Sequence, residues 1–204
     1  MKLTGAIVGA ALACLASGAA NAATVTYEFK GVTTDANLGG TPFDGAFDIV
    51  ATGSTGGVYT APSPPFSPDT LVAPVTIKIT LDGVGEVTVT DPAYFFNNRT
   101  FKALGFGGLP MGDFLDFGSG GSPALAVYNL VSSIGPISVT GGGGQYVDTT
   151  GGLLILGFPD PGAFTAQLSV PEPATWAMML LGFGGLGAVL RSRRRRQACA
   201  VSTA

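Results

Sequence analysis

The chain has 204 residues, of which 46% are hydrophobic and only 11% are charged. It contains no histidine, which excludes Ser-His-Asp and Cys-His catalytic sites and the usual zinc sites. Setting aside Lys2, Glu172 and the five arginines near the C-terminus leaves four basic and twelve acidic residues, a net charge of −8. An acidic domain of this kind excludes nucleic acid and anionic lipid as direct partners, because both require a positive protein surface.

The first 22 residues have the three parts of a secretory signal peptide. Lys2 supplies the positive start, residues 3–15 form an apolar segment, and Ala20 and Ala22 match the small-x-small cleavage pattern. The sequence therefore predicts export, with cleavage between Ala22 and Ala23.

Residues 23–169 have the length of one domain. Both cysteines, Cys14 and Cys199, lie outside this region, so no disulfide can stabilise it. Apolar and polar residues alternate over 24–30 and 75–81, which is the period of a half-buried strand. Residues 74–90 predict a hairpin through an Asp-Gly-Val-Gly turn.

Many further short strands are separated by Gly-rich and Pro-rich turns. They are predicted at 43–52, 93–96, 100–104, 114–117, 124–131, 137–140, 153–158 and 163–170. We expect an all-β, antiparallel β-sandwich, with a jelly roll as one version. The alternative is a Gly-rich, partly disordered surface polymer, but that would leave the alternating aromatic and β-branched side chains exposed.

Without histidine, the carboxylates are the main side chains that could still act in catalysis or bind a metal ion. The pairs Asp113 with Asp116 and Asp44 with Asp48 are candidates for calcium, which needs only oxygen ligands. Neither lies in a dense acidic loop, so solvated loops are the favoured interpretation, and we predict no metal and no cofactor. Since a glycosidase needs only two carboxylates, a polysaccharide hydrolase or lyase stays open as an alternative.

Two other stretches carry weaker hints of binding. Residues 94–99 combine aromatics, amides and an arginine, as sugar-binding surfaces do, although a strand end with core aromatics is the favoured interpretation. Ice binding would require a flat face of regularly spaced threonines, and residues 24–26 and 88–90 supply too few.

The clearest functional signal lies at residues 170–196. Pro173 biases Glu172 toward an extended conformation, so a helix is expected to begin near residue 174. Residues 174–190 contain no charge, and a helix of that length spans about 25 Å, slightly less than the roughly 30 Å hydrocarbon core. The segment is followed by a basic cluster that would stay in the cytoplasm, Arg191, Arg193, Arg194, Arg195 and Arg196.

The order of these elements resembles the PEP-CTERM sorting signal in its PEPxxWA form. The matching residues are Pro171, Glu172, Pro173, Trp176, Ala177, Met178 and Met179, with the apolar segment and the arginines behind them. The resemblance covers residues 170–196 only. It implies export, transient membrane retention, and recognition by an exosortase, a membrane cysteine protease that removes the tail and releases the protein to the cell surface or extracellular matrix.

An ordinary stop-transfer anchor is the alternative for this segment, but it has no need for Pro-Glu-Pro beside Trp-Ala-Met-Met. Residues 197–204 are interpreted as a cytoplasmic extension. Together these features predict an exported surface or matrix protein that is not an enzyme and has a structural or carbohydrate-associated role. Its expected partners are an exosortase, the membrane through the C-terminal helix, and extracellular polysaccharide.

Overall fold

A computed structural model describes residues 22–62, 67–108, 112–118, 122–143, 146–157, 162–169, 179–187 and 191. Residues Ala22–Ser169 form one compact unit, and residues 1–21 and 170–204 are grouped as another. Most of the predicted signal peptide and of the predicted sorting signal lies outside the described residues. Within the second unit, residues 179–187 are helical.

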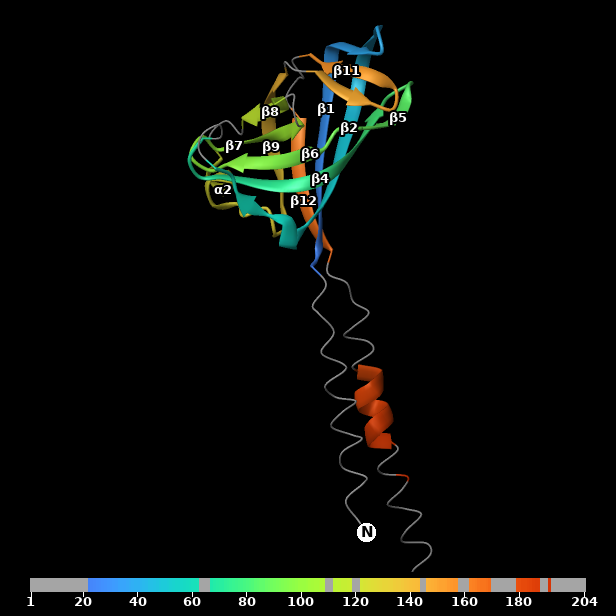
Figure 1. Cartoon of the computed structure of the whole chain (residues 1–204), viewed down its shortest axis with the longest axis vertical. Helices are drawn as coiled ribbons and strands as arrows, with labels where there is room; N and C mark the ends of the chain where they lie inside the picture. The colour runs from blue at the N-terminus through green and yellow to red at the C-terminus, as the bar shows by residue number, and fades with distance from the viewer. Residues whose placement is uncertain are drawn as a thin grey trace, which may run out of the picture. The chain divides into compact units, whose positions relative to one another are not determined.

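The described part of the Ala22–Ser169 unit is dominated by strands joined in one antiparallel sheet (Figure 1). Their bounds are β1 Thr24–Leu38, β2 Thr41–Ser54, β3 Tyr59–Thr60, β4 Thr70–Leu81, β5 Gly85–Thr88, β6 Ala93–Asn98, β7 Ala103–Gly108, β8 Gly112–Gly118, β9 Ile134–Gly143, β10 Tyr146–Thr149, β11 Gly152–Leu156 and β12 Gly162–Ser169. A short turn of 3-10 helix, η1 (Thr55–Gly57), follows β2. The predicted all-β, antiparallel class is confirmed.

Eight of these strands close into a barrel instead of two packed sheets. The order β1-β12-β9-β8-β7-β6-β4-β2 returns to its start, because β1 pairs with both β12 and β2. Thr24 illustrates the closure, since it lies opposite Ser169 on one side and Ser54 on the other. The expected sandwich is corrected here: alternation predicts one inward face per strand but does not say which strands pair at the edges.

A second, smaller closure lies at the other end of β1 and β2, the two long strands of Figure 1. There β11 pairs with the end of β1, and β10 pairs with β11. The chain after β5 completes this closure, since Thr90 donates its N–H to the Asp148 carbonyl and Val89 forms a bridge with Thr149. β5 in turn pairs with β4. The backbone N–H and C=O groups at the edge of the β10–β11 hairpin therefore largely have hydrogen-bond partners.

Aromatic side chains fill the barrel interior. The rings of Tyr27 on β1 and Phe95 on β6 stack with centroids 4.3 Å apart. The ring centroids of Phe29 and Phe117 are 3.8 Å apart. Phe95 also stacks on Phe164 at 5.4 Å. An eight-stranded barrel has an interior that side chains can just fill, so these rings make a packed core.

One predicted strand is wrong. Residues 124–131 form the short helix α2 (Pro123–Val127) and the loop that follows it. Pro123 favours a helix start, because its fixed φ suits the first helical position. Leu125, Tyr128 and Leu130 are 0%, 3% and 0% exposed, so residues 123–130 form a plug whose apolar side chains pack into the core. The predicted strand at 100–104 likewise begins only at Ala103, after a turn.

Candidate functional site

The predicted processing residues are only partly within the described chain. Ala22 and Ala23 directly precede β1, and Ala20 lies outside the described residues. Two of the predicted sorting and membrane-stop residues are described. Met179 is the first described residue of the helical stretch 179–187 and is 47% exposed, and Arg191 is also exposed. Pro171, Glu172, Pro173, Trp176, Ala177, Met178 and Arg193 to Arg196 lie outside it. No helix among the described residues is both long enough and apolar enough to cross a membrane.

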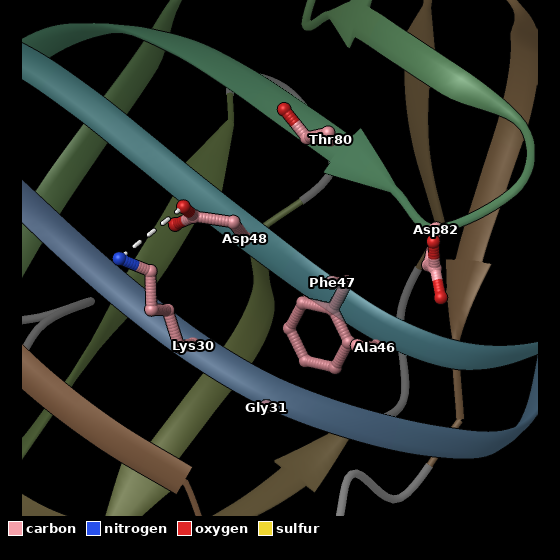
Figure 2. Close-up of a pocket in the computed structure, with 7 residues that line it drawn as sticks. All are labelled: Lys30, Gly31, Ala46, Phe47, Asp48, Thr80 and Asp82. Atoms are coloured by element: carbon pink, nitrogen blue, oxygen red, sulfur yellow. Dashed lines mark ion pairs between the residues drawn. The ribbon is translucent and has the colours of Figure 1, made fainter.

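A groove of about 310 Å³ lies on the outer wall of the sheet across β1, β2 and the end of β4 (Figure 2). Its lining is Lys30, Gly31, Ala46, Phe47, Asp48, Thr80 and Asp82. We call it the Asp48–Asp82 groove. Strand register brings these residues together, because Asp48 lies opposite Lys30 on β1 and Thr80 on β4. The backbone N–H of Asp82 donates to the Ala46 carbonyl at 3.0 Å, which holds the far end of the groove.

The polar end of the Asp48–Asp82 groove contains a compact charge cluster. Lys30 Nζ is 2.5 Å from Glu28 Oε1 and 3.7 Å from Asp48 Oδ2. The hydrogen bond from Lys30 lowers the pKa of Glu28, whereas burial and the nearby Glu28 carboxylate raise the pKa of Asp48. Asp48 Oδ1 is buried and has no hydrogen-bond partner among the described residues.

A second polar patch lies on the outer face of β6, β7 and β8. Tyr94 Oη donates to Asp113 Oδ1 at 2.8 Å. The register of β7 and β8 shifts between Phe106 and Gly107, where β8 carries one extra residue, Phe114, and this β-bulge lets Asp113 and Asp116 both lie opposite glycines of β7. Without that extra residue, positions three apart on a strand would point to opposite faces, so the bulge is what unites the two predicted carboxylates.

Glycines on β7 make room for this patch. A Cβ on Gly107 would lie 2.3 Å from the Tyr94 ring, and one on Gly105 would lie 2.9 Å from Asp116 Oδ1 and 2.3 Å from the Leu115 carbonyl oxygen. The Tyr94 side chain can therefore cross β7 to reach Asp113. Side chains at these two positions would separate β6 from the carboxylates of β8.

The Asp116 carboxylate has an unusual pKa. Partial burial of the Asp116 carboxylate is the main cause, and the charge of the adjacent Asp113 carboxylate is the smaller one. Together they raise the pKa of Asp116 to about 6 from an ordinary value of 3.8. Burial also raises the pKa of Asp113, which the hydrogen bond from Tyr94 partly offsets. The folded protein therefore holds a proton on Asp116 more tightly than the unfolded chain does.

This difference predicts a pH-dependent stability. The contribution of protonated Asp116 is complete below about pH 4 and is lost as the pH rises through about 6. We expect Asp116→Asn to raise the free energy of unfolding at neutral pH by about 1 kcal/mol, after allowing for solvent screening of this partly exposed carboxylate. Urea unfolding of both proteins across this pH range measures the effect. A difference that does not change with pH, or that Asp35→Asn reproduces, would contradict it.

The structure separates the other residues to which the sequence pointed. Asp44 and Asp48 lie four residues apart on β2, about 13 Å along an extended strand, too far to share one cation. Among the described residues, no group of three or more acidic, cysteine or histidine side chains is placed to hold a metal ion.

Residues 94–97 of the supposed sugar-binding surface are at most 8% exposed, so the core interpretation applies to them.

The threonines do not form a regular array. Thr26, Thr52 and Thr76 make one row across β1, β2 and β4. The next row contains Glu28, Val50 and Lys78, whose charges interrupt the pattern. Among the described residues, the outer face of β1, β2 and β4 therefore lacks the repeated flat threonine array that ice binding would require.

The Asp48–Asp82 groove was missed by sequence reasoning. Its residues come from three strands up to 52 positions apart in the chain, and no local motif joins them. Only the register of β1, β2 and β4 brings these residues together, and the alternating sequence pattern alone does not determine that register.

Comparison with known proteins identifies one segment of the chain. Residues 169–195 match a family model described as the PEP-CTERM protein-sorting motif. No curated protein and no solved structure matched the chain. The matched residues coincide with the Pro-Glu-Pro, apolar and arginine segments found in the sequence, and they begin at the last residue of β12. The chain therefore carries a PEP-CTERM sorting motif, the signal of exported proteins that an exosortase processes.

Proposed function

We propose that this protein is an exosortase substrate that works at the cell surface or in the extracellular matrix, in association with polysaccharide and without catalysing a reaction itself. The observation that carries the proposal is the PEP-CTERM match at residues 169–195. Its position supports processing, because the motif begins where the last barrel strand ends. Removal of the tail leaves every barrel strand intact.

The two ends of the barrel-forming chain support this arrangement. Thr24, next to the predicted signal-peptidase site, is paired with Ser169, next to the sorting motif. Seven consecutive pairs join β1 and β12, so both processing sites adjoin one hydrogen-bonded strand pair. Both cleavages therefore take place in the segments that flank the folded barrel.

We further propose a membrane-held precursor. The support is the uncharged segment 174–190 followed by arginines. Within its described part, the large apolar side chains are exposed, including Leu180 at 71% and Phe183 at 69%. Exposed apolar side chains of this size suit contact with lipid.

The non-enzymatic role has a direct test. We expect the purified protein to leave the number of reducing ends in matrix polysaccharide unchanged. The chain contains no histidine, and the clearest carboxylate pair among the described residues, Asp113 with Asp116, lies on an outer wall beside the buried Tyr94. A reducing-end assay over a long incubation measures this. The second candidate function, a carboxylate-dependent hydrolase or lyase, is favoured by the Asp113 and Asp116 alignment.

The two candidates are distinguished by one variant. An increase in reducing ends that disappears when Asp113 and Asp116 are both replaced by Asn would replace our proposal with the enzymatic one. An increase that survives this double replacement would point to a contaminant, and repetition with protein purified by a second route would then show no activity.

A further inference from the structure

The Asp48–Asp82 groove combines an apolar floor with an excess of negative charge. Gly31, Ala46 and Phe47 line its centre, and Lys30, Asp48, Thr80 and Asp82 stand around them. Figure 2 shows Lys30 and Asp48 reaching toward each other at one side, with Asp82 on the far side of Ala46 and Phe47. Gly31 and the exposed Ala46 contribute the smallest side chains to this lining.

The single cation of the groove is already engaged. Lys30 is held by Glu28 at 2.5 Å and lies 3.7 Å from Asp48. No ion pair among the described residues reaches Asp82, and Asp48 Oδ1 accepts no hydrogen bond from them. Two carboxylates, Asp48 and Asp82, thus line the groove against one ammonium that Glu28 already engages, so the groove favours a ligand that brings its own positive charge.

The charge of the exported chain as a whole points the same way. Its net charge of −8 attracts cationic polymers over distances up to the screening length and repels anionic ones. A groove of about 310 Å³ is large enough for one or two sugar rings. An apolar floor with polar groups at the rim suits a pyranose, whose C–H face is apolar and whose edge carries hydroxyls.

We propose that the Asp48–Asp82 groove binds a positively charged amino sugar, such as a glucosamine unit of a partly de-N-acetylated polysaccharide. The ammonium group pairs with Asp82 at the end away from Lys30, the ring lies over Ala46 and Gly31, and Thr80 bonds to a hydroxyl. This inference rests on the proposed association with polysaccharide and specifies its chemistry.

Calorimetric titration of the full chain in mild detergent tests the inference, with a glucosamine oligomer, the matching N-acetylglucosamine oligomer and oligolysine as probes. We expect the glucosamine oligomer to bind at least about tenfold more tightly than the acetylated one, and to weaken as salt is added. Asp82→Asn should reduce its affinity about tenfold. Ala46→Leu, which fills the hollow at an exposed position, should abolish binding.

Asp35→Asn is the matched control, because it removes the same charge at an exposed position of β1 that does not line the groove. Its affinity should remain within about twofold of the unmodified protein. Far-ultraviolet circular dichroism of each variant shows whether the sheet is intact, and Asp82→Asn alone decides the question if Ala46→Leu fails to fold.

Three results would overturn the inference, and each has a distinct meaning. Equal affinity for both sugar oligomers would remove the role of the ammonium group but leave polysaccharide association in place. Oligolysine binding of equal strength that depends on Asp82 would reassign the groove to basic peptides. Absence of binding to either sugar oligomer and to neutral matrix polysaccharide would defeat the proposed association as well.

Discussion

When Glu172 or Pro173 is replaced by Ala, we expect the protein to keep its C-terminal tail and to disappear almost completely from the surface-released fraction. The unmodified protein should be released with its C-terminus close to Pro173. The physical reason is that the sequence Pro-Glu-Pro favours a rigid, extended backbone that a protease can bind directly, whereas alanine would allow a helix to extend through this segment. Intact-mass analysis of released and membrane fractions measures the outcome.

Gln197→Ala is the control for this prediction, because it lies beyond the arginines and leaves the motif unchanged. We expect normal release of that variant, and retention of the unmodified protein in cells that lack the exosortase. Released protein that still carries residues 174–204 would contradict the sorting mechanism. Retention of all variants and of the unmodified protein alike would identify the segment as an ordinary stop-transfer anchor.

The second large effect is expected at Asn97, inside the barrel. This residue is completely buried, and its Nδ2 donates to the carbonyls of Leu125 and Tyr128, each at 2.9 Å. These bonds hold the plug of residues 123–130, whose other end is held by Tyr27 Oη donating to the Leu130 carbonyl at 2.7 Å. Asn97→Ala leaves two buried carbonyls without that donor and opens a small cavity.

We expect Asn97→Ala to lower the free energy of unfolding by roughly 3 kcal/mol. In a domain of this size that loss lowers the melting temperature by about 6 to 12 °C. Urea unfolding followed by circular dichroism measures the first quantity, and calorimetry measures the second. The plug should also become more accessible, which faster amide hydrogen exchange in residues 124–131 would show.

Asn129→Ala provides the comparison within the same segment. Asn129 is exposed and its Oδ1 accepts hydrogen bonds from the Val131 N–H and the Ser132 hydroxyl, so its loss should cost about 0.5 to 1 kcal/mol. If Asn97→Ala proved no more costly than Asn129→Ala, the plug would contribute little to stability, and the assignment of Asn97 as its anchor would fail.

Several strands of the barrel were predictable, but their closure was not. The alternation around Val25, Tyr27 and Phe29 follows from strand geometry, in which successive side chains point to opposite faces. Residues 124–131 were also predicted as a strand, but Leu125, Tyr128 and Leu130 face the core from a helix and a loop. An apolar segment indicates burial more reliably than it indicates the backbone conformation that buries it.

The polar patches show the same division. Asp113 and Asp116 were recognised as a pair, yet a regular strand would place them on opposite faces, and the bulge opposite β7 decided otherwise. For Asp48 and Asp82 no pairing was predicted, because their proximity depends on hydrogen bonds between β2 and the end of β4.

The PEP-CTERM sorting motif, which implies export, could be recognised without any knowledge of the fold. The sorting motif is a continuous segment whose rigid, apolar and basic parts act in their order along the chain, so its meaning does not depend on the fold. The closed barrel, the burial of Asn97 and the Asp48–Asp82 groove became apparent only in the folded protein. Each of these depends on strand register, which is set by the packing of distant residues and by backbone hydrogen bonds that leave no local trace in the sequence.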